Sequence, residues 1–315
     1  MTNARLASAI LVAIGALLPR TAVAAEWVEP KFDPPLGSKW IIERQIDVEK
    51  NSGGTMIGHT LKDRALLTFE SKSEAGYVVT FTRQGSSYEG EPGEAARQRI
   101  VYQAMQGLVM RIDTDLTGKP LRVENWDEVK AALKSAADSE PLTTANPEFV
   151  ARVHDIIDRS LRLDDRQAAQ LYVDDLPTLA LAQDTGLKKG EIHKSTVTVP
   201  SALRSEISKT VMVSLGDADP ETGKARYLVT ETYDPTSVRA LVSETVKGFS
   251  ITNVNASLVD QALKSATVAG VSRVQLNVEG GMTRELREES FLSLRAPGTI
   301  SVDTESKLVT VKPAE

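Results

Sequence analysis

The sequence predicts an α+β protein: largely antiparallel, curved β-sheet with a central helical block at about residues 125–183. Before and after this block, apolar and polar side chains alternate every two residues, as in strands with one covered face. Within the block, apolar residues recur at the three- and four-residue spacing of amphipathic helices. Short strands joined by hairpin-length turns favour antiparallel pairing over a βαβ repeat.

Residues 1–24 have the layout of a secretory signal peptide. Arg5 precedes an apolar run from Leu6 to Leu18, and small residues at 22–24 predict cleavage between Ala24 and Ala25. The run of about 13 residues is too short to cross a membrane, which takes roughly 20. We therefore expect an exported, soluble mature protein without a membrane span.

Composition narrows the location and the partners. The chain has no cysteine, which excludes disulfides and anchoring through a lipid-modified cysteine. Together with the signal peptide, this predicts a bacterial periplasmic location. With 37 Lys+Arg against 43 Asp+Glu, the formal net charge is −6, and no basic run offsets it. Nucleic acid is therefore excluded as the expected partner.

Residues 25–124 form the predicted N-terminal β-rich segment. A proline-rich entry leads into a strand at 39–49. The clearest hairpin spans 59–84, where Leu67 and Phe69 alternate before the turn SEAG, and Tyr77 and Phe81 alternate after it. A second pair of strands is expected at 107–115 and 120–124.

Residues 125–183 form the predicted helical block of two to four helices. Trp126, Val129 and Leu133 have helical spacing, and Asn125 precedes them as a possible cap. A second helix is predicted from Pro147 to residue 161. A third is expected to end before residue 177.

Residues 184–315 form the predicted C-terminal β-rich segment. Strand-like runs rich in Val and Thr begin at about residue 190, and one helix-like piece at 255–266 interrupts them. The two β-rich segments are either parts of one sheet, and so one domain, or two separate domains.

The stretch DTDLTGKPLRVE, residues 113–124, is the nearest match to a known chemical motif. Asp113, Asp115, Thr117 and Glu124 occupy positions 1, 3, 5 and 12 of an EF-hand calcium loop. However, Pro120 lacks the N–H expected at position 8, and the flanking residues alternate like strands. We therefore reject the calcium site and predict a turn between two strands, with a similar turn at 214–229.

Motifs for catalysis or metal binding are missing. The three histidines, His59, His154 and His193, are far apart. Asp158, four residues after His154 on a predicted helix, could accept its ring N–H, and we interpret this pair as a surface interaction in preference to a proton-transfer pair or a metal half-site. Ser205 and Lys209 share one face of a predicted strand, and acidic runs such as REES read as solvated faces. We predict no catalytic, cofactor-binding or metal-binding residue, and no cofactor.

A short motif joins the predicted turn to the helical block. It is a D-x-x-G-K turn followed by an N-x-x-E-V helix start, formed by Asp115, Gly118, Lys119, Asn125, Glu128 and Val129. On these residues the chain resembles a family of uncharacterised, exported, β-rich bacterial proteins of the periplasm. The resemblance implies architecture and location, and no activity.

Two classes of function follow. The first is a non-enzymatic periplasmic binding or envelope-associated protein, whose curved sheet offers an apolar face to a lipid, a peptide or a protein partner. Its outline is similar to that of periplasmic lipoprotein carriers with half-barrel sheets. The alternative is a hydrolase or lyase whose carboxylates and histidines come together only in the fold.

Overall fold

The computed structural model describes residues 27, 29, 31–90, 106–137, 147–173, 176, 179, 185–200, 206–240, 266–296 and 299–314. The predicted signal peptide at 1–24 and nearly all of the helix-like piece at 255–266 lie outside these residues. Among the helices described, none has the length and apolar character needed to cross a membrane.

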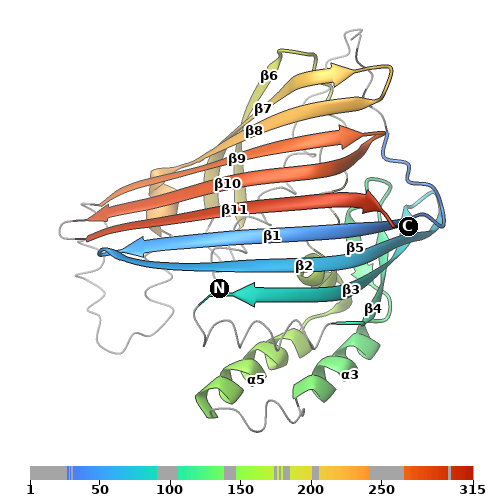
Figure 1. Cartoon of the computed structure of the whole chain (residues 1–315), viewed down its shortest axis with the longest axis horizontal. Helices are drawn as coiled ribbons and strands as arrows, with labels where there is room; N and C mark the ends of the chain where they lie inside the picture. The colour runs from blue at the N-terminus through green and yellow to red at the C-terminus, as the bar shows by residue number, and fades with distance from the viewer. Residues whose placement is uncertain are drawn as a thin grey trace.

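Eleven described strands form one antiparallel sheet (Figure 1). In chain order they are β1 (Lys39–Ser52), β2 (Thr55–Lys72), β3 (Tyr77–Glu89), β4 (Val109–Thr114), β5 (Pro120–Val123), β6 (Ile192–Pro200), β7 (Glu206–Asp219), β8 (Lys224–Tyr233), β9 (Thr267–Glu279), β10 (Met282–Ala296) and β11 (Thr299–Pro313). Across the sheet the order is β5-β4-β3-β2-β1-β11-β10-β9-β8-β7-β6.

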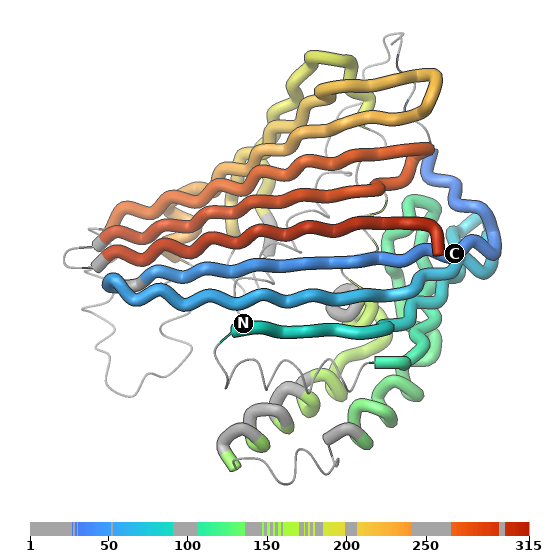
Figure 2. The backbone as a smooth tube through the Cα atoms, viewed as in Figure 1, coloured from blue at the N-terminus to red at the C-terminus, as the bar shows by residue number. Residues whose placement is uncertain are grey.

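The two β-rich segments meet at the pair β1–β11. Trp40 lies opposite Pro313 at one end of this pair, and Ser52 lies opposite Ser301 at the other. Every other neighbouring pair is consecutive in the chain, so each half of the sheet is a simple meander. Figure 2 shows the sheet bending, so that β5 and β6 lie behind the central strands.

The predicted hairpin at 59–84 is confirmed. β2 and β3 pair on either side of the turn, with Leu67 directly opposite Phe81. Both side chains are buried, as the alternating pattern requires.

The α+β fold class with a central helical block is wrong, because the described residues are nearly all β. Among the described residues, the helices of eight or more residues are three short elements, α3 (Trp126–Ala137), α5 (Pro147–Leu161) and α6 (Asp165–Tyr172). Figure 1 places α3 and α5 beyond β3, at one end of the sheet. They follow β5 and precede β6, which are the two edge strands of the sheet. The helical segment does not interrupt the sheet, which continues unbroken through β1 and β11. Its buried residues, among them Val129 of α3 and Ala168 of α6, pack into the main core.

Local contacts fix these helices. Asp164 and Gln167 form a reciprocal capping box at the start of α6. The indole Nε1 of Trp126, at the start of α3, donates to the carbonyl of Leu163 at 2.8 Å. This bond ties α3 to the residues just before α6.

One face of the sheet is covered and contains the core. We call this the inner face; on β1 it carries Trp40 and Ile42, and the opposite, outer face is partly or fully exposed. The N-terminal segment packs into this core through Trp27 and Phe32. The Phe32 ring makes edge contacts with Phe69, at a centroid distance of 5.9 Å, and with Tyr77.

Candidate functional site

A row of charged and polar side chains crosses the inner face of the sheet. We call it the buried charge belt; across the sheet its members are Arg83 (β3), Asp63 (β2), Arg44 (β1), Lys307 and Glu305 (β11), Glu288 (β10), Ser272 (β9), Glu231 (β8) and Lys209 (β7). All of them are buried. Four are cations and four are carboxylic acids, so the formal charges of the belt balance.

The alternation of each strand places these side chains among core residues. On β1, Arg44 stands between Ile42 and Ile46 in a run of alternate buried positions. Strand pairing then sets Asp63 of β2 directly opposite Arg44. The side chains of the belt therefore lie on the covered face of the sheet and not on the protein surface.

The first end of the belt contains two arginines around one carboxylate. Arg44 Nη2 donates to Asp63 Oδ2 at 3.0 Å, and Arg83 Nη1 contacts the same oxygen. All three side chains are almost completely buried. Charge-assisted bonds of this kind are strong, because little water competes for them.

The second end of the belt contains three of its four carboxylic acids, Glu231, Glu288 and Glu305, and we call it the acidic end. Lys209 Nζ donates to Glu231 Oε1 at 2.8 Å. On the neighbouring strands, Ser272 Oγ donates to Glu288 Oε1 at 3.0 Å. Strand pairing sets Ser272 opposite Glu231, so the two bonded pairs lie side by side.

Two carboxylate oxygens at this end have no hydrogen-bond partner. Glu231 Oε2 and Glu288 Oε2 are both buried, and the side chains of these residues are almost fully covered. A buried acceptor left unpaired typically costs about 1–3 kcal/mol, and more if it is charged. A donor or cation brought to these oxygens would recover that free energy.

Burial shifts the pKa values at the acidic end in the direction that favours the neutral form of each group. Desolvation raises the pKa of Glu231 to about 7, against the attraction of Lys209. Desolvation, helped by the charge of Glu288, raises the pKa of Glu305 to about 7. The pKa of Glu288 is also raised by desolvation, and that of Lys209 is lowered for the same reason.

Such an arrangement is costly for a purely structural core. Removing an ion from water costs several kcal/mol even when a partner is present, and an apolar side chain of similar size often gives equal or better stability. Clusters of buried groups with shifted pKa values are a recognised mark of functional sites. The acidic end of the belt is therefore the strongest candidate site among the described residues.

Apolar side chains lie on both sides of the belt. The main core occupies one side, while a second cluster of Ile46, Val48, Leu61 and Tyr88 lies on the other side at β1–β3. Ile46 is directly opposite Lys307, so this cluster begins next to the belt. The inner face thus combines charged and apolar surface within a few strands.

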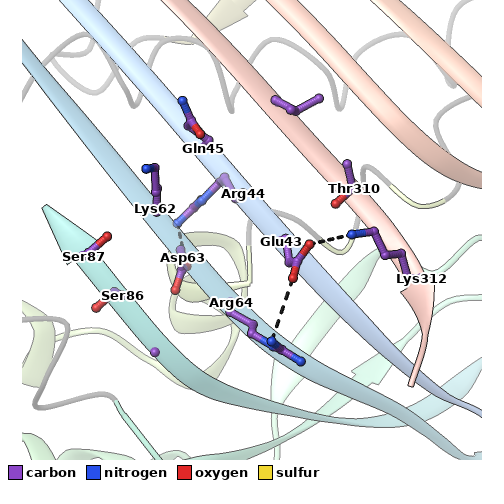
Figure 3. Close-up of a pocket in the computed structure, with 12 residues that line it drawn as sticks. Glu43, Arg44, Gln45, Lys62, Asp63, Arg64, Ser86, Ser87, Thr310 and Lys312 are labelled. Atoms are coloured by element: carbon purple, nitrogen blue, oxygen red, sulfur yellow. Dashed lines mark hydrogen bonds and ion pairs between the residues drawn. The ribbon is translucent and has the colours of Figure 1, made fainter. Parts of the chain in front are cut away.

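A shallow groove of about 520 Å³ lies on the outer face over β3, β2, β1 and β11 (Figure 3). Glu43 is placed there between Lys312, at 2.8 Å, and Arg64, at 3.9 Å. These side chains are largely exposed, and such ion pairs contribute little. We regard this groove as a weaker candidate than the belt.

The rejected calcium loop is a turn between two strands, as predicted, with β4 on one side and β5 on the other. Asp115 Oδ1 accepts from Thr117 N at 2.8 Å, Thr117 Oγ1 at 2.6 Å and Lys119 N at 3.0 Å. Asp113 Oδ2 accepts from Arg122 Nε at 2.5 Å, and Glu124 lies 3.4 Å from the Nε of Arg111. These carboxylates serve the turn and the strand pair.

The similar turn predicted at 214–229 joins β7 to β8. Asp219 Oδ1 accepts from Glu221 N at 3.0 Å, and Thr222 Oγ1 donates to Asp219 Oδ2 at 2.7 Å. Gly223 has a positive φ of 64°, as Gly118 does with 77° in the first turn.

The three histidines lie on different elements. His59 is on β2, stacked on Tyr88 with ring centroids 5.1 Å apart, while His154 is on α5 and His193 is on β6. None of them belongs to the acidic end of the belt. Within the described ranges, no group of three or more His, Cys, Asp or Glu side chains is placed to hold a metal ion.

Sequence reasoning missed the belt. Glu288 belongs to the run REES, which was expected to be a solvated face, and Lys209 was considered only with Ser205, which lies outside the described residues. The signal available was a charged residue at an inward position of an alternating strand, such as Arg44 between Ile42 and Ile46. A charged residue can be recognised as inward-facing only when the covered face of its strand is known.

Comparisons with known proteins identify no family. No family model matches the chain, and no curated protein matches it. One solved structure, described by its lipid–protein interactions in lipovitellin, aligns with 89% of this chain at 9% identity and a TM-score of 0.41. The chain spans only 26% of that protein. An outer membrane channel from Pseudomonas putida F1 aligns with 91% of this chain and 100% of its own, at 8% identity and a TM-score of 0.18.

Proposed function

We propose that this protein is a non-enzymatic binding protein of the bacterial periplasm. Its ligand would be a small amphipathic molecule, with an apolar body and a cationic or hydrogen-donating head. One observation carries the proposal: Glu231 and Glu288 each hold a buried carboxylate oxygen without a hydrogen-bond partner, on a sheet face that is otherwise rich in apolar side chains.

The head group would bind at the acidic end of the belt. A cationic head supplies both charge and donors, and in a covered site each bond to a carboxylate is worth more than in water. The apolar body would be placed against the neighbouring core residues Val211, Val229 and Val274, which are buried on the same strands. Burying apolar surface would provide most of the affinity, at roughly 25 cal/mol per Å².

The location in the periplasm is part of the proposal. It is supported by the signal-peptide layout of residues 1–24 and the absence of cysteine. A carrier of amphipathic molecules has an evident role between two membranes, where such molecules need protection from water.

The geometry favours binding over the hydrolase or lyase alternative. That alternative needs a histidine, or a water held by one, next to a carboxylate with a shifted pKa. The carboxyls with raised pKa in the belt lie on β8, β10 and β11, whereas the described histidines lie on β2, α5 and β6.

A matched pair of fluorescent probes tests the proposal. A dansyl-labelled long-chain alkylamine and a dansyl-labelled fatty acid of equal length would be titrated into the purified full-length mature protein. We expect saturable fluorescence enhancement with the amine and at least tenfold weaker binding of the acid. Binding of neither probe, together with no small molecule detected by mass spectrometry after solvent extraction of the purified protein, would overturn the proposal.

Glu288→Gln tests the position of the head group. We expect it to reduce the preference for the amine at least fivefold, because an amide carries no charge. Glu289→Gln is the matched control, since Glu289 is exposed on the outer face of the same strand. An equal effect of both variants would place the head group elsewhere.

A further inference from the structure

The two edges of the sheet differ in how they are protected. An edge strand exposes unpaired backbone N–H and C=O groups that can pair with another strand, and proteins normally shield them. At one edge, β5 has four residues, begins with Pro120, and is in contact with α6. This edge is short, lacks one donor and is covered.

The other edge, β6, is more than twice as long, and its one proline, Pro200, lies at its very end. It has nine residues and pairs with β7 along its whole length, from Ile192 opposite Ser214 to Pro200 opposite Glu206. No other described strand pairs with it. Ile192 is 66% exposed, and Lys194, Thr196 and Thr198 are exposed as well.

We propose that β6 is a self-association surface, which pairs antiparallel with β6 of a second copy of this chain. The partner of a strand edge must be another extended backbone, because alternate N–H and C=O groups of β6 point away from β7 in a regular row. The same edge on a second copy offers the same row with matching spacing. The proposal is independent of the ligand proposed for the inner face.

The sequence of β6 fits a two-fold axis at Thr196. Around this axis Thr196 meets Thr196 of the other copy, Ser195 meets Val197, and Lys194 meets Thr198. Lys194 is the one Asp, Glu, Lys or Arg in Ile192–Pro200, so no like charges face each other. Threonine pairs across strands are favourable, and isologous pairing is the usual form of a homodimer.

The contact is small, and its strength is expected to depend on concentration. It consists of one strand pair, well below the area of a permanent dimer. We therefore expect monomer and dimer in exchange, with the dimer fraction rising over the micromolar range in analytical ultracentrifugation of the full-length mature protein.

A single introduced cysteine tests the register. The natural chain has none, so any disulfide formed by Thr196→Cys joins two copies. Directly opposite residues in an antiparallel pair have Cα atoms about 4.5–5.5 Å apart, within the range of a disulfide. Two copies of Thr198 would be offset by four residues, roughly 13 Å, which is too far.

We expect Thr196→Cys to form a covalent dimer under mild oxidation and Thr198→Cys to form much less. Thr230→Cys is the control, since Thr230 lies on β8, which is paired on both sides. Equal cross-linking at all three positions would overturn the register. A wild-type protein that stays monomeric at all concentrations would overturn the proposal.

A charge exchange gives a second test that does not need oxidation. Thr196→Lys and Thr196→Glu each place like charges across the two-fold axis, and we expect each variant alone to be monomeric. An equal mixture of the two places opposite charges there and should restore the dimer. A mixture no more dimeric than either variant alone, or an unchanged dimer in both variants, would contradict pairing through β6.

Discussion

Lys209 and Glu231 form an ion pair inside the sheet, with Nζ and Oε1 2.8 Å apart and neither side chain exposed. The two residues are not directly opposite, because β7 pairs Lys209 with Tyr233 and Glu231 with Val211. The pair therefore spans a diagonal on the inner face. Desolvation opposes the charged form of both groups, and their mutual attraction offsets part of that cost.

Removing one member of this pair should destabilise the protein strongly. Lys209→Met leaves Glu231 buried without its cation, and we expect a loss of about 3–5 kcal/mol in the free energy of unfolding. Urea denaturation followed by circular dichroism measures it. The double variant Lys209→Met with Glu231→Leu should lose less than Lys209→Met alone, because no buried charge is left.

An exposed ion pair serves as the control for that measurement. Lys224 Nζ lies 3.6 Å from Glu279, and both side chains are about half exposed. We expect Lys224→Met to change stability by less than about 1 kcal/mol. Similar losses in Lys209→Met and Lys224→Met would show that burial does not control the cost.

Stability should fall as the pH rises through neutrality. The pKa values of Glu231 and Glu305 are raised to about 7 in the folded protein, from 4.5 in a solvated carboxyl. The folded state holds these protons more tightly, so their contribution is complete below pH 4.5 and is lost as the pH rises through 7. Each group contributes on the order of 3 kcal/mol over that window. Urea denaturation from pH 5 to 8.5 measures it.

Glu305→Gln measures how much of this pH dependence comes from Glu305. Glutamine is neutral at every pH, so the variant should reduce the slope of stability against pH by about 1.4 kcal/mol per pH unit between 5 and 7. Glu289→Gln, on the exposed face of β10, should leave the slope unchanged. A stability that increases steadily from pH 5 to 8 would refute the assignment.

The turn between β4 and β5 should depend on Asp115. This carboxylate accepts three hydrogen bonds within the turn, and Asp115→Ala should reduce the free energy of unfolding by about 1–2 kcal/mol. Glu221→Ala, at an exposed position in the β7–β8 turn, should have almost no effect. Wild-type melting temperature should not rise in millimolar calcium, and a clear rise abolished by Asp113→Ala would restore the calcium interpretation.

Close packing of two turns makes Gly76 sensitive. Its φ is +154°, and a Cβ atom there would overlap the carbonyl oxygen of Thr114 and lie 2.7 Å from Asp115 Cα. We expect Gly76→Ala to cost about 2–4 kcal/mol in thermal or urea unfolding. Gly54→Ala is the control: its φ is also positive, at +86°, but no atom lies within 4 Å, so about 1 kcal/mol is expected.

Local features of the fold follow from the sequence, while the fold class does not. Alternation located the hairpin of β2 and β3, and turn chemistry identified the β4–β5 turn, because both depend on residues close in the chain. The fold class depended on which strands pair across long distances. The sequence shows a helical segment between two β-rich segments, and the pairing of β1 with β11 was needed to show that these two segments form one continuous sheet.

The candidate site was not predictable for a related reason. A charged residue in a strand is ordinarily exposed, and Glu289 and Glu288 are adjacent in REES with opposite environments. Register decides which of the two points inward. The belt exists only after eight strands are aligned, so its members have no common spacing in the sequence.

The pairing of β1 with β11 has a consequence for how the chain folds. The middle of the sheet can form only when residues near position 40 pair with residues near position 313. Until β11 is available to pair, β1 and β10 each present a long edge of unpaired backbone groups. β11, fifteen residues long, joins the two halves of the sheet. Deleting it would leave two separate half-sheets that are prone to aggregation.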